Sequence, residues 1–102
     1  MDIDINDIEI MNPDEGGGSV YWYQGQPFTG KIVEYKNNIL VAEIIVIDSH
    51  TEGRVAFYYN NGQIMQEYFE KYNDTYGVYR DWDEDGNLIS EIDYALNLFI
   101  KN

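Results

Sequence analysis

Several residue types are missing or scarce in this chain of 102 residues, and each shortage excludes a class of function. The absence of cysteine excludes disulfides, thiolate nucleophiles, zinc–thiolate sites and iron–sulfur clusters, and it favours a cytoplasmic protein. Six lysines and arginines face 19 acids, and the net charge of −13 excludes phosphate-led binding to nucleic acid and adsorption to anionic membranes. No apolar run is long enough to cross a membrane, and the acidic start lacks the basic residues of a signal peptide. The charge therefore favours a basic partner.

Aromatic residues, by contrast, are plentiful. Ten Tyr, four Phe and two Trp, together with many Ile and Val, favour strands over helices and predict an all-β globular domain. Residues 1–15 contain six acids and no base, and the stretch that follows is rich in Gly. We therefore divide the chain into an acidic N-terminal appendage with a Gly-rich linker over residues 1–18 and a β-hairpin repeat domain over residues 19–102.

An internal repeat organises the second part of the chain. Segments 34–43, 58–67 and 82–91 align with an offset of 24 residues. Their centres read Asn-Asn, Asn-Gly and Asp-Gly, which are dipeptides typical of tight hairpin turns. Each turn lies between two strand-like stretches, so the sequence predicts an antiparallel meander of about three 24-residue β-hairpins. The side chains expected to pack the sheet are Ile32, Val33, Leu40, Ile44, Val55, Phe57, Ile64, Tyr68, Leu88 and Ile92.

The repeat unit consists of a glycine, an aromatic-rich strand, Tyr-x-Asn-Gly, a hydrophobic pair and then Glu. It resembles MORN-type repeats, and in particular the bacterial YwqK-type variant, through the lead-in 21–31 and the unit 58–67. The likeness covers residues 19–94, although the first unit has Asn38 where Gly is expected and an unusually apolar stretch over 44–50. The resemblance implies an antitoxin or immunity protein that binds a cognate protein toxin, with no catalytic residues to carry over.

Three glutamates occupy one repeat position. We expect Glu43, Glu67 and Glu91 to lie on one face of the sheet, two strands and about 9–10 Å apart. Such an acidic stripe is either an ordinary solvated face or a ladder of charge that faces a basic toxin.

Aromatic and acidic residues supply the other candidate contacts. Tyr58 and Trp82 share a repeat position and are either sheet cladding or part of an exposed protein-binding patch. Asp81, Asp83 and Asp85 precede Gly86 with the spacing of the first half of a calcium-binding EF-hand loop. The motif then requires a glutamate six residues after the glycine, where this chain has isoleucine, so a plain acidic hairpin turn is favoured and no metal site is predicted.

Residues for catalysis are scarce. His50 is the only histidine and is expected in an exposed turn, and Ser49 beside it makes no triad. We therefore predict neither an enzyme nor a cofactor. The leading hypothesis is an antitoxin or immunity protein, and the alternatives are a MORN-like scaffolding module and an acidic decoy that mimics nucleic acid.

The edges of the predicted meander need protection, because unpaired strands promote aggregation. Residues 1–12, the terminal stretch 96–100, or a homodimer formed through an edge strand are the three possibilities.

Overall fold

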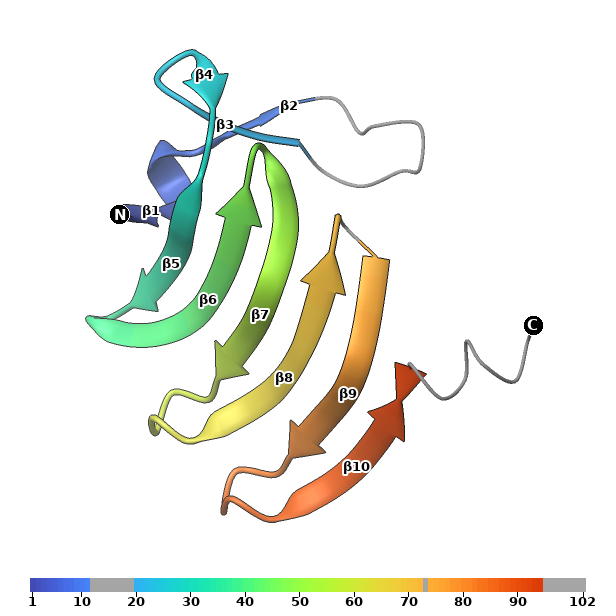
Figure 1. The fold of residues 1–102 in the computed structure, drawn as a ribbon. Coiled ribbons are helices and arrows are strands. Elements are labelled where there is room, and N and C mark those ends of the chain that lie inside the picture. Colours follow the sequence, from blue (N-terminus) through green and yellow to red (C-terminus); the bar gives the residue numbers. More distant parts are fainter. Residues whose placement is uncertain (12–19, 73, 95–102) are drawn as a thin grey trace, which may run out of the picture.

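The computed structural model describes residues 1–11, 20–72 and 74–94, and most of these residues form strands (Figure 1). The terminal stretch 96–100 lies outside the described residues. In chain order the elements are β1 (Asp2–Asp4), the 3₁₀ turn η1 (Ile5–Asp7), β2 (Glu9–Met11), β3 (Val20–Tyr23), β4 (Gln26–Pro27), β5 (Gly30–Lys36), β6 (Ile39–Ile47), β7 (His50–Tyr58), β8 (Ile64–Lys71), β9 (Asp74–Trp82) and β10 (Leu88–Asp93).

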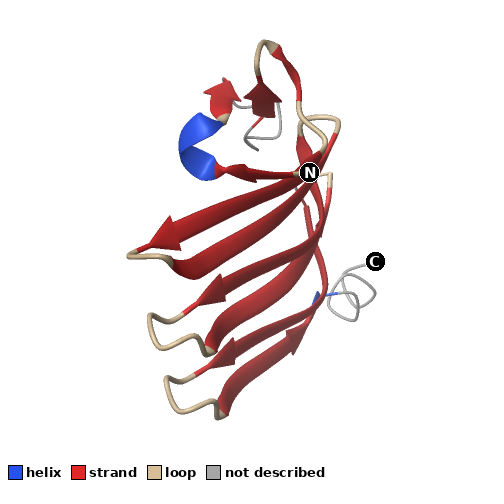
Figure 2. Cartoon of the chain, turned by 90° about the vertical axis from the view of Figure 1, so that its left-hand side faces the viewer, coloured by secondary structure: helices blue, strands red, loops and turns tan. Residues whose placement is uncertain are grey.

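The larger of two sheets contains the predicted repeats. Its strand order is β1-β5-β6-β7-β8-β9-β10, and every neighbouring pair from β5 to β10 is antiparallel. The all-β meander of three consecutive hairpins is therefore confirmed. Figures 1 and 2 show a single bowed layer in which the turns of the three hairpins lie along one side.

The three hairpin turns are of two kinds. In the second and third units a glycine adopts a positive φ, +88° at Gly62 and +90° at Gly86, and closes a longer turn. Its amide donates to the carbonyl of the residue three positions before it, Tyr59 or Asp83. The first unit has Asn instead of that Gly, and only Asn37 and Asn38 connect its strands, both with positive φ.

Bulges in the strands follow the same 24-residue period as the sequence. The pairing register skips Val41 in β6, Met65 in β8 and Ile89 in β10. The glycines Gly53 and Gly77, expected just before the strands, lie inside β7 and β9 with φ of +115° and +71°. The register is irregular at these positions as well, so the glycines allow the strands to continue through a bulge.

The connection between the first and second hairpins is short. Only Asp48 and Ser49 join β6 to β7. His50 is consequently not an exposed turn residue: it begins β7, is half-buried, and its ring stacks on that of Tyr72 with 4.1 Å between centroids. A longer strand explains the difference, because the backbone of this region pairs with its neighbours instead of looping out.

The first eleven residues, which we expected as an appendage, lie against the repeat sheet. β1 pairs in parallel with β5, with Ile3 opposite Ile32. After η1, strand β2 forms a small antiparallel sheet with β3 and β4 at the β5 end of the molecule (Figure 1). The buried cluster of Phe28, Ile32 and Val46 lies there. Its partly buried apolar neighbours are Ile3, Ile5, Ile8, Tyr21, Tyr23 and Ile44.

The larger sheet has two different faces. Register places Ile32, Ile44, Val55 and Tyr68 in one row across four strands, and we call this side the aromatic face because the Tyr68 and Tyr79 rings stack on it, 5.1 Å apart. Burial raises the pKa of Tyr68 to about 12.

Part of the predicted packing is absent at the far end of the sheet. Leu88 and Ile92 were expected in the core but are 50% and 41% exposed. They lie on the last strand, away from the small sheet that covers the first strands (Figure 1). Among the described residues, no helix is long and apolar enough to span a membrane.

Candidate functional site

A row of charged side chains crosses the face opposite the aromatic one. We call it the charge ladder, and its members are Lys31, Glu43, Arg54, Glu67, Arg80 and Glu91, one on each strand from β5 to β10. Register aligns its three glutamates in one line, because Glu43 and Glu67 both lie opposite Ala56, and Glu67 and Glu91 both lie opposite Arg80. The prediction that they share a face is therefore confirmed.

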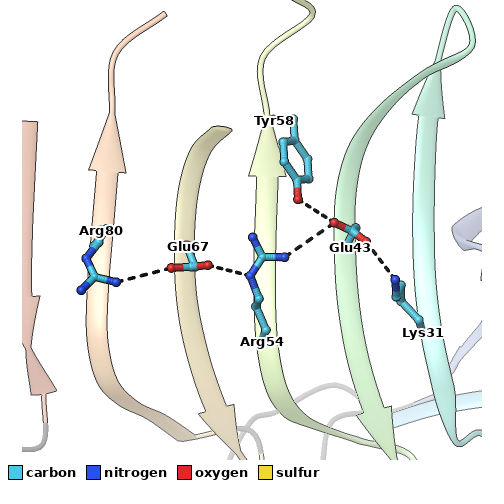
Figure 3. A network of polar contacts seen from close by, with 6 residues as sticks. All are labelled: Lys31, Glu43, Arg54, Tyr58, Glu67 and Arg80. Atoms are coloured by element: carbon cyan, nitrogen blue, oxygen red, sulfur yellow. Dashed lines mark hydrogen bonds and ion pairs between the residues drawn. The ribbon is translucent and has the colours of Figure 1, made fainter. Parts of the chain in front are cut away.

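Ion pairs connect neighbouring members of the ladder, and Figure 3 shows those from Lys31 to Arg80. Lys31 Nζ lies 3.0 Å from Glu43, and Arg54 bridges Glu43 and Glu67 at 3.6 and 2.6 Å. Arg80 then bridges Glu67 and Glu91 at 3.5 and 2.8 Å. Positive and negative charges therefore alternate from strand to strand, which is the favourable arrangement for cross-strand neighbours.

The ladder corrects the expected acidic stripe. Each glutamate is paired with at least one base, so the row has three charges of each sign and no net charge. The acidic residues that give the chain its net charge of −13 must therefore lie outside the ladder. A face of paired charges also explains how a single-layer sheet can expose one side to water.

Within the ladder, Glu43 accepts hydrogen bonds from both Tyr58 and Lys31. Its side chain is 18% exposed, and one of its oxygens accepts a hydrogen bond of 2.6 Å from the Tyr58 hydroxyl. This bond, followed by those of Lys31, lowers the pKa of the Glu43 carboxyl. Burial in turn raises the pKa of the Tyr58 phenol, so that Tyr58 remains a donor. Tyr58 is therefore part of the sheet's internal network.

Acidic charge gathers instead at the turn between β9 and β10. We call this the acidic hairpin end, residues 82–89: it contains Asp83, Glu84 and Asp85, has no base, and carries Leu88 and Ile89 at 50% and 65% exposure. The corresponding turns at 37–38 and 60–63 contain no charged residue. One hairpin turn of the three thus combines exposed apolar side chains with acids that form no ion pair with any base in the described part of the chain.

Hydrogen bonds hold the acidic hairpin end in one conformation. Asp83 Oδ1 accepts from the amides of Asp85 and Asn87 at 3.0 and 2.9 Å, and the amide of Asn87 is the main cause that lowers the pKa of Asp83. The neighbouring hairpin adds two bonds: Asn61 Nδ2 donates to the Glu84 carbonyl at 2.9 Å, and the Tyr59 hydroxyl donates to the Trp82 carbonyl at 2.8 Å. A turn fixed in this way loses little conformational entropy when it binds a partner.

The structure thus separates the residues that the sequence grouped as partner contacts. Trp82, Asp83, Asp85 and Glu91 come together on the last hairpin. Glu43 and Glu67 are inner members of the charge ladder, of which Glu91 is the last, and Tyr58 donates a hydrogen bond to Glu43. Asp81 lies opposite Gln66, on the aromatic face, and accepts a 2.9 Å hydrogen bond from it.

Sequence reasoning missed the bases of the ladder. Lys31, Arg54 and Arg80 are not related by the 24-residue offset that reveals the glutamates. A usable signal was present, because the first strand of each predicted hairpin contains one of these bases and the second strand contains the glutamate. Within residues 1–11, 20–72 and 74–94, no group of three or more His, Asp or Glu residues is arranged to hold a metal ion.

Comparison with known proteins gives a family match. The chain matches no curated protein and no solved structure. A family model described as a MORN repeat variant matches residues 51–70 and 75–95. These ranges correspond to the β7–β8 and β9–β10 hairpins, and a repeat of this kind indicates a module for protein interaction. Over its second and third hairpins, the chain is similar to the MORN repeat variant.

Proposed function

We propose that this protein is an antitoxin or immunity protein that neutralises a basic protein toxin, and that the acidic hairpin end makes the first contact. The observation that carries the proposal is the combination of three acids and two exposed apolar side chains on one turn held by hydrogen bonds. The acids attract a basic surface over a distance, and the apolar side chains supply the area that a stable complex buries.

The ladder bears on the alternative of a nucleic-acid mimic. A decoy needs acids spaced like phosphates along an extended surface, but the regular row on this sheet alternates in sign. The acidic hairpin end is a local patch, which suits one partner better than many. The other alternative is a scaffolding module that does not neutralise a toxin. The experiment must distinguish it from an antitoxin.

The test is growth rescue in bacteria. The C-terminal domain of the protein encoded next to this one is expressed with and without the full chain. We expect the neighbour to stop growth and this chain to restore it. If the neighbouring protein is harmless, or if it stops growth even when this chain is present, the antitoxin hypothesis is contradicted. Scaffolding would then be the favoured function.

Paired variants then locate the contact. Glu84→Gln with Asp85→Asn removes two charges from the acidic hairpin end and leaves Asp83, which holds the turn. Asp7→Asn with Asp48→Asn removes two exposed acids elsewhere. We expect the first pair to slow association with the purified toxin by roughly tenfold at low salt, and the second pair to change it little. Equal effects would place the contact elsewhere.

A further inference from the structure

The two edges of the larger sheet are formed by strands of different length. At one edge the three-residue strand β1 pairs with β5 and is itself the outer strand, so only a short edge with two aspartates is presented there. At the other edge β10 is last in the strand order and pairs with β9 alone among the described strands. An uncovered edge strand presents backbone groups that can pair with a further strand.

The charge ladder reaches both edges. At the β1 edge, Asp2 lies opposite Lys31 and, after Glu43, also contributes to raising the pKa of the Lys31 amine. Counting Asp2, the sign of the charge alternates over all seven strands, and it is negative on both outer ones. The next strand beyond β10 would continue the alternation with a positive charge.

Glu91 shows that the ladder is open at β10. Glu43 and Glu67 each contact bases on both sides and are 18% and 17% exposed. Glu91 forms an ion pair with Arg80 alone among the residues that the structure describes, and it is 51% exposed. One side of this carboxylate therefore faces the space that an added strand would occupy.

We propose that β10 accepts an extended segment of the partner protein as an eighth strand, with a lysine or arginine placed beside Glu91. Leu88, Ile89 and Ile92 are 50%, 65% and 41% exposed on the same strand, and they supply apolar contacts to alternate side chains of the incoming segment. This inference deepens the proposed function, because it names the part of the partner that binds and the side chain that recognises Glu91.

A second copy of this chain fits the site poorly. The two strands that form the outer edges of the sheet read Asp-Ile-Asp in β1 and Leu-Ile-Ser-Glu-Ile-Asp in β10, so neither brings a base to Glu91. Two copies would also bring together chains that each carry −13. Charge complementarity therefore favours a different, basic protein over the homodimer that the sequence left open.

Two synthetic peptides test the proposal on the full chain. Each has nine residues of alternating threonine and valine, and the central residue is arginine in one and glutamate in the other. Binding is followed by NMR titration, and amide hydrogen exchange locates it. We expect the arginine peptide to slow exchange in residues 88–93 and to bind about 5–10-fold more tightly than the glutamate peptide at low salt, with a smaller ratio at high salt.

Reversal of one charge sharpens the test. Glu91→Lys is expected to invert the preference between the two peptides, while Asp7→Lys, with the same change in net charge, keeps it. Glu91 is exposed, so its loss leaves the fold intact, and circular dichroism verifies this. The proposal would be overturned if the arginine peptide did not bind, or if both peptides bound equally well. It would also be overturned if the peptide slowed hydrogen exchange away from β10, or if Glu91→Lys kept the preference for the arginine peptide. Self-association of the chain through β10, detected by sedimentation, would overturn it as well.

The outcome is independent of the growth assay. If the peptides behave as expected and the neighbour is harmless, the edge site stands and the antitoxin function fails. If growth is rescued and the peptides do not discriminate, the function stands and the edge site fails.

Discussion

At the scale of single residues, the members of the charge ladder are not equivalent. Glu43 accepts from both Tyr58 and Lys31 and is 18% exposed, whereas Glu91 has one ionic partner and is 51% exposed. Glu43→Gln should lower the free energy of unfolding by about 1–3 kcal/mol, because the neutral amide has one acceptor oxygen instead of two and replaces the charge-assisted hydrogen bonds from Tyr58 and Lys31 with weaker ones. Glu91→Gln should change it little. Urea unfolding of the two variants measures the difference, and equal losses would contradict the burial argument.

The same carboxylate makes stability depend on pH. The hydrogen bond from Tyr58, followed by that from Lys31, holds the folded-state pKa of Glu43 below its ordinary value of 4.5. A lowered pKa means that Glu43 stabilises the fold fully above 4.5 and loses this contribution as the pH falls through the lower, folded-state value. The gap in unfolding free energy between the wild type and Glu43→Gln should therefore narrow below pH 4.5. Urea unfolding from pH 7 to pH 3 tests this, and a constant gap would rule out the carboxylate as its origin.

At the scale of elements, the two bulge glycines differ in how well they tolerate a side chain. A Cβ added at Gly53 would lie 3.4 Å from Ile45 atoms, and its φ of +115° is outside the region that other residues adopt. Gly77 has open space around it and a φ of +71°. Gly53→Ala should therefore lower the unfolding free energy by about 2–3 kcal/mol and Gly77→Ala by about 1 kcal/mol. Thermal unfolding compares them, and the reverse order would contradict this account of the bulge.

The sequence predicted the strands and hairpins better than it predicted the contacts between individual side chains. The 24-residue offset placed all three hairpins and put the glutamates on one face, because repeat position determines strand and face together. The partners of those glutamates were not predicted, since long side chains such as those of Lys31 and Arg54 reach across strands from positions that do not repeat. That residues 1–12 protect an edge was one of three possibilities, and β1 does pair with β5. Which strand it joins was not predicted, because the apolar residues at 3, 5, 8 and 10 do not show this.

At the scale of the whole molecule, the first eleven residues determine which backbone the sheet exposes at its β5 end. Ile3 lies opposite Ile32 on the parallel β1–β5 pair and packs against the buried cluster. A charge at this position would separate β1 from β5. It would then uncover apolar surface and a second edge strand at the same time.

Ile3→Asp is therefore expected to lower the unfolding free energy by about 1–3 kcal/mol and to promote self-association through the released β5 edge. Ile10→Asp is the matched control, because it makes the same chemical change at a side chain that is 59% exposed in β2. Sedimentation velocity and urea unfolding of both variants separate the outcomes. If Ile3→Asp remains monomeric and is as stable as Ile10→Asp, β1 does not protect the β5 strand. The proposed difference between the two edges of the sheet would then be contradicted.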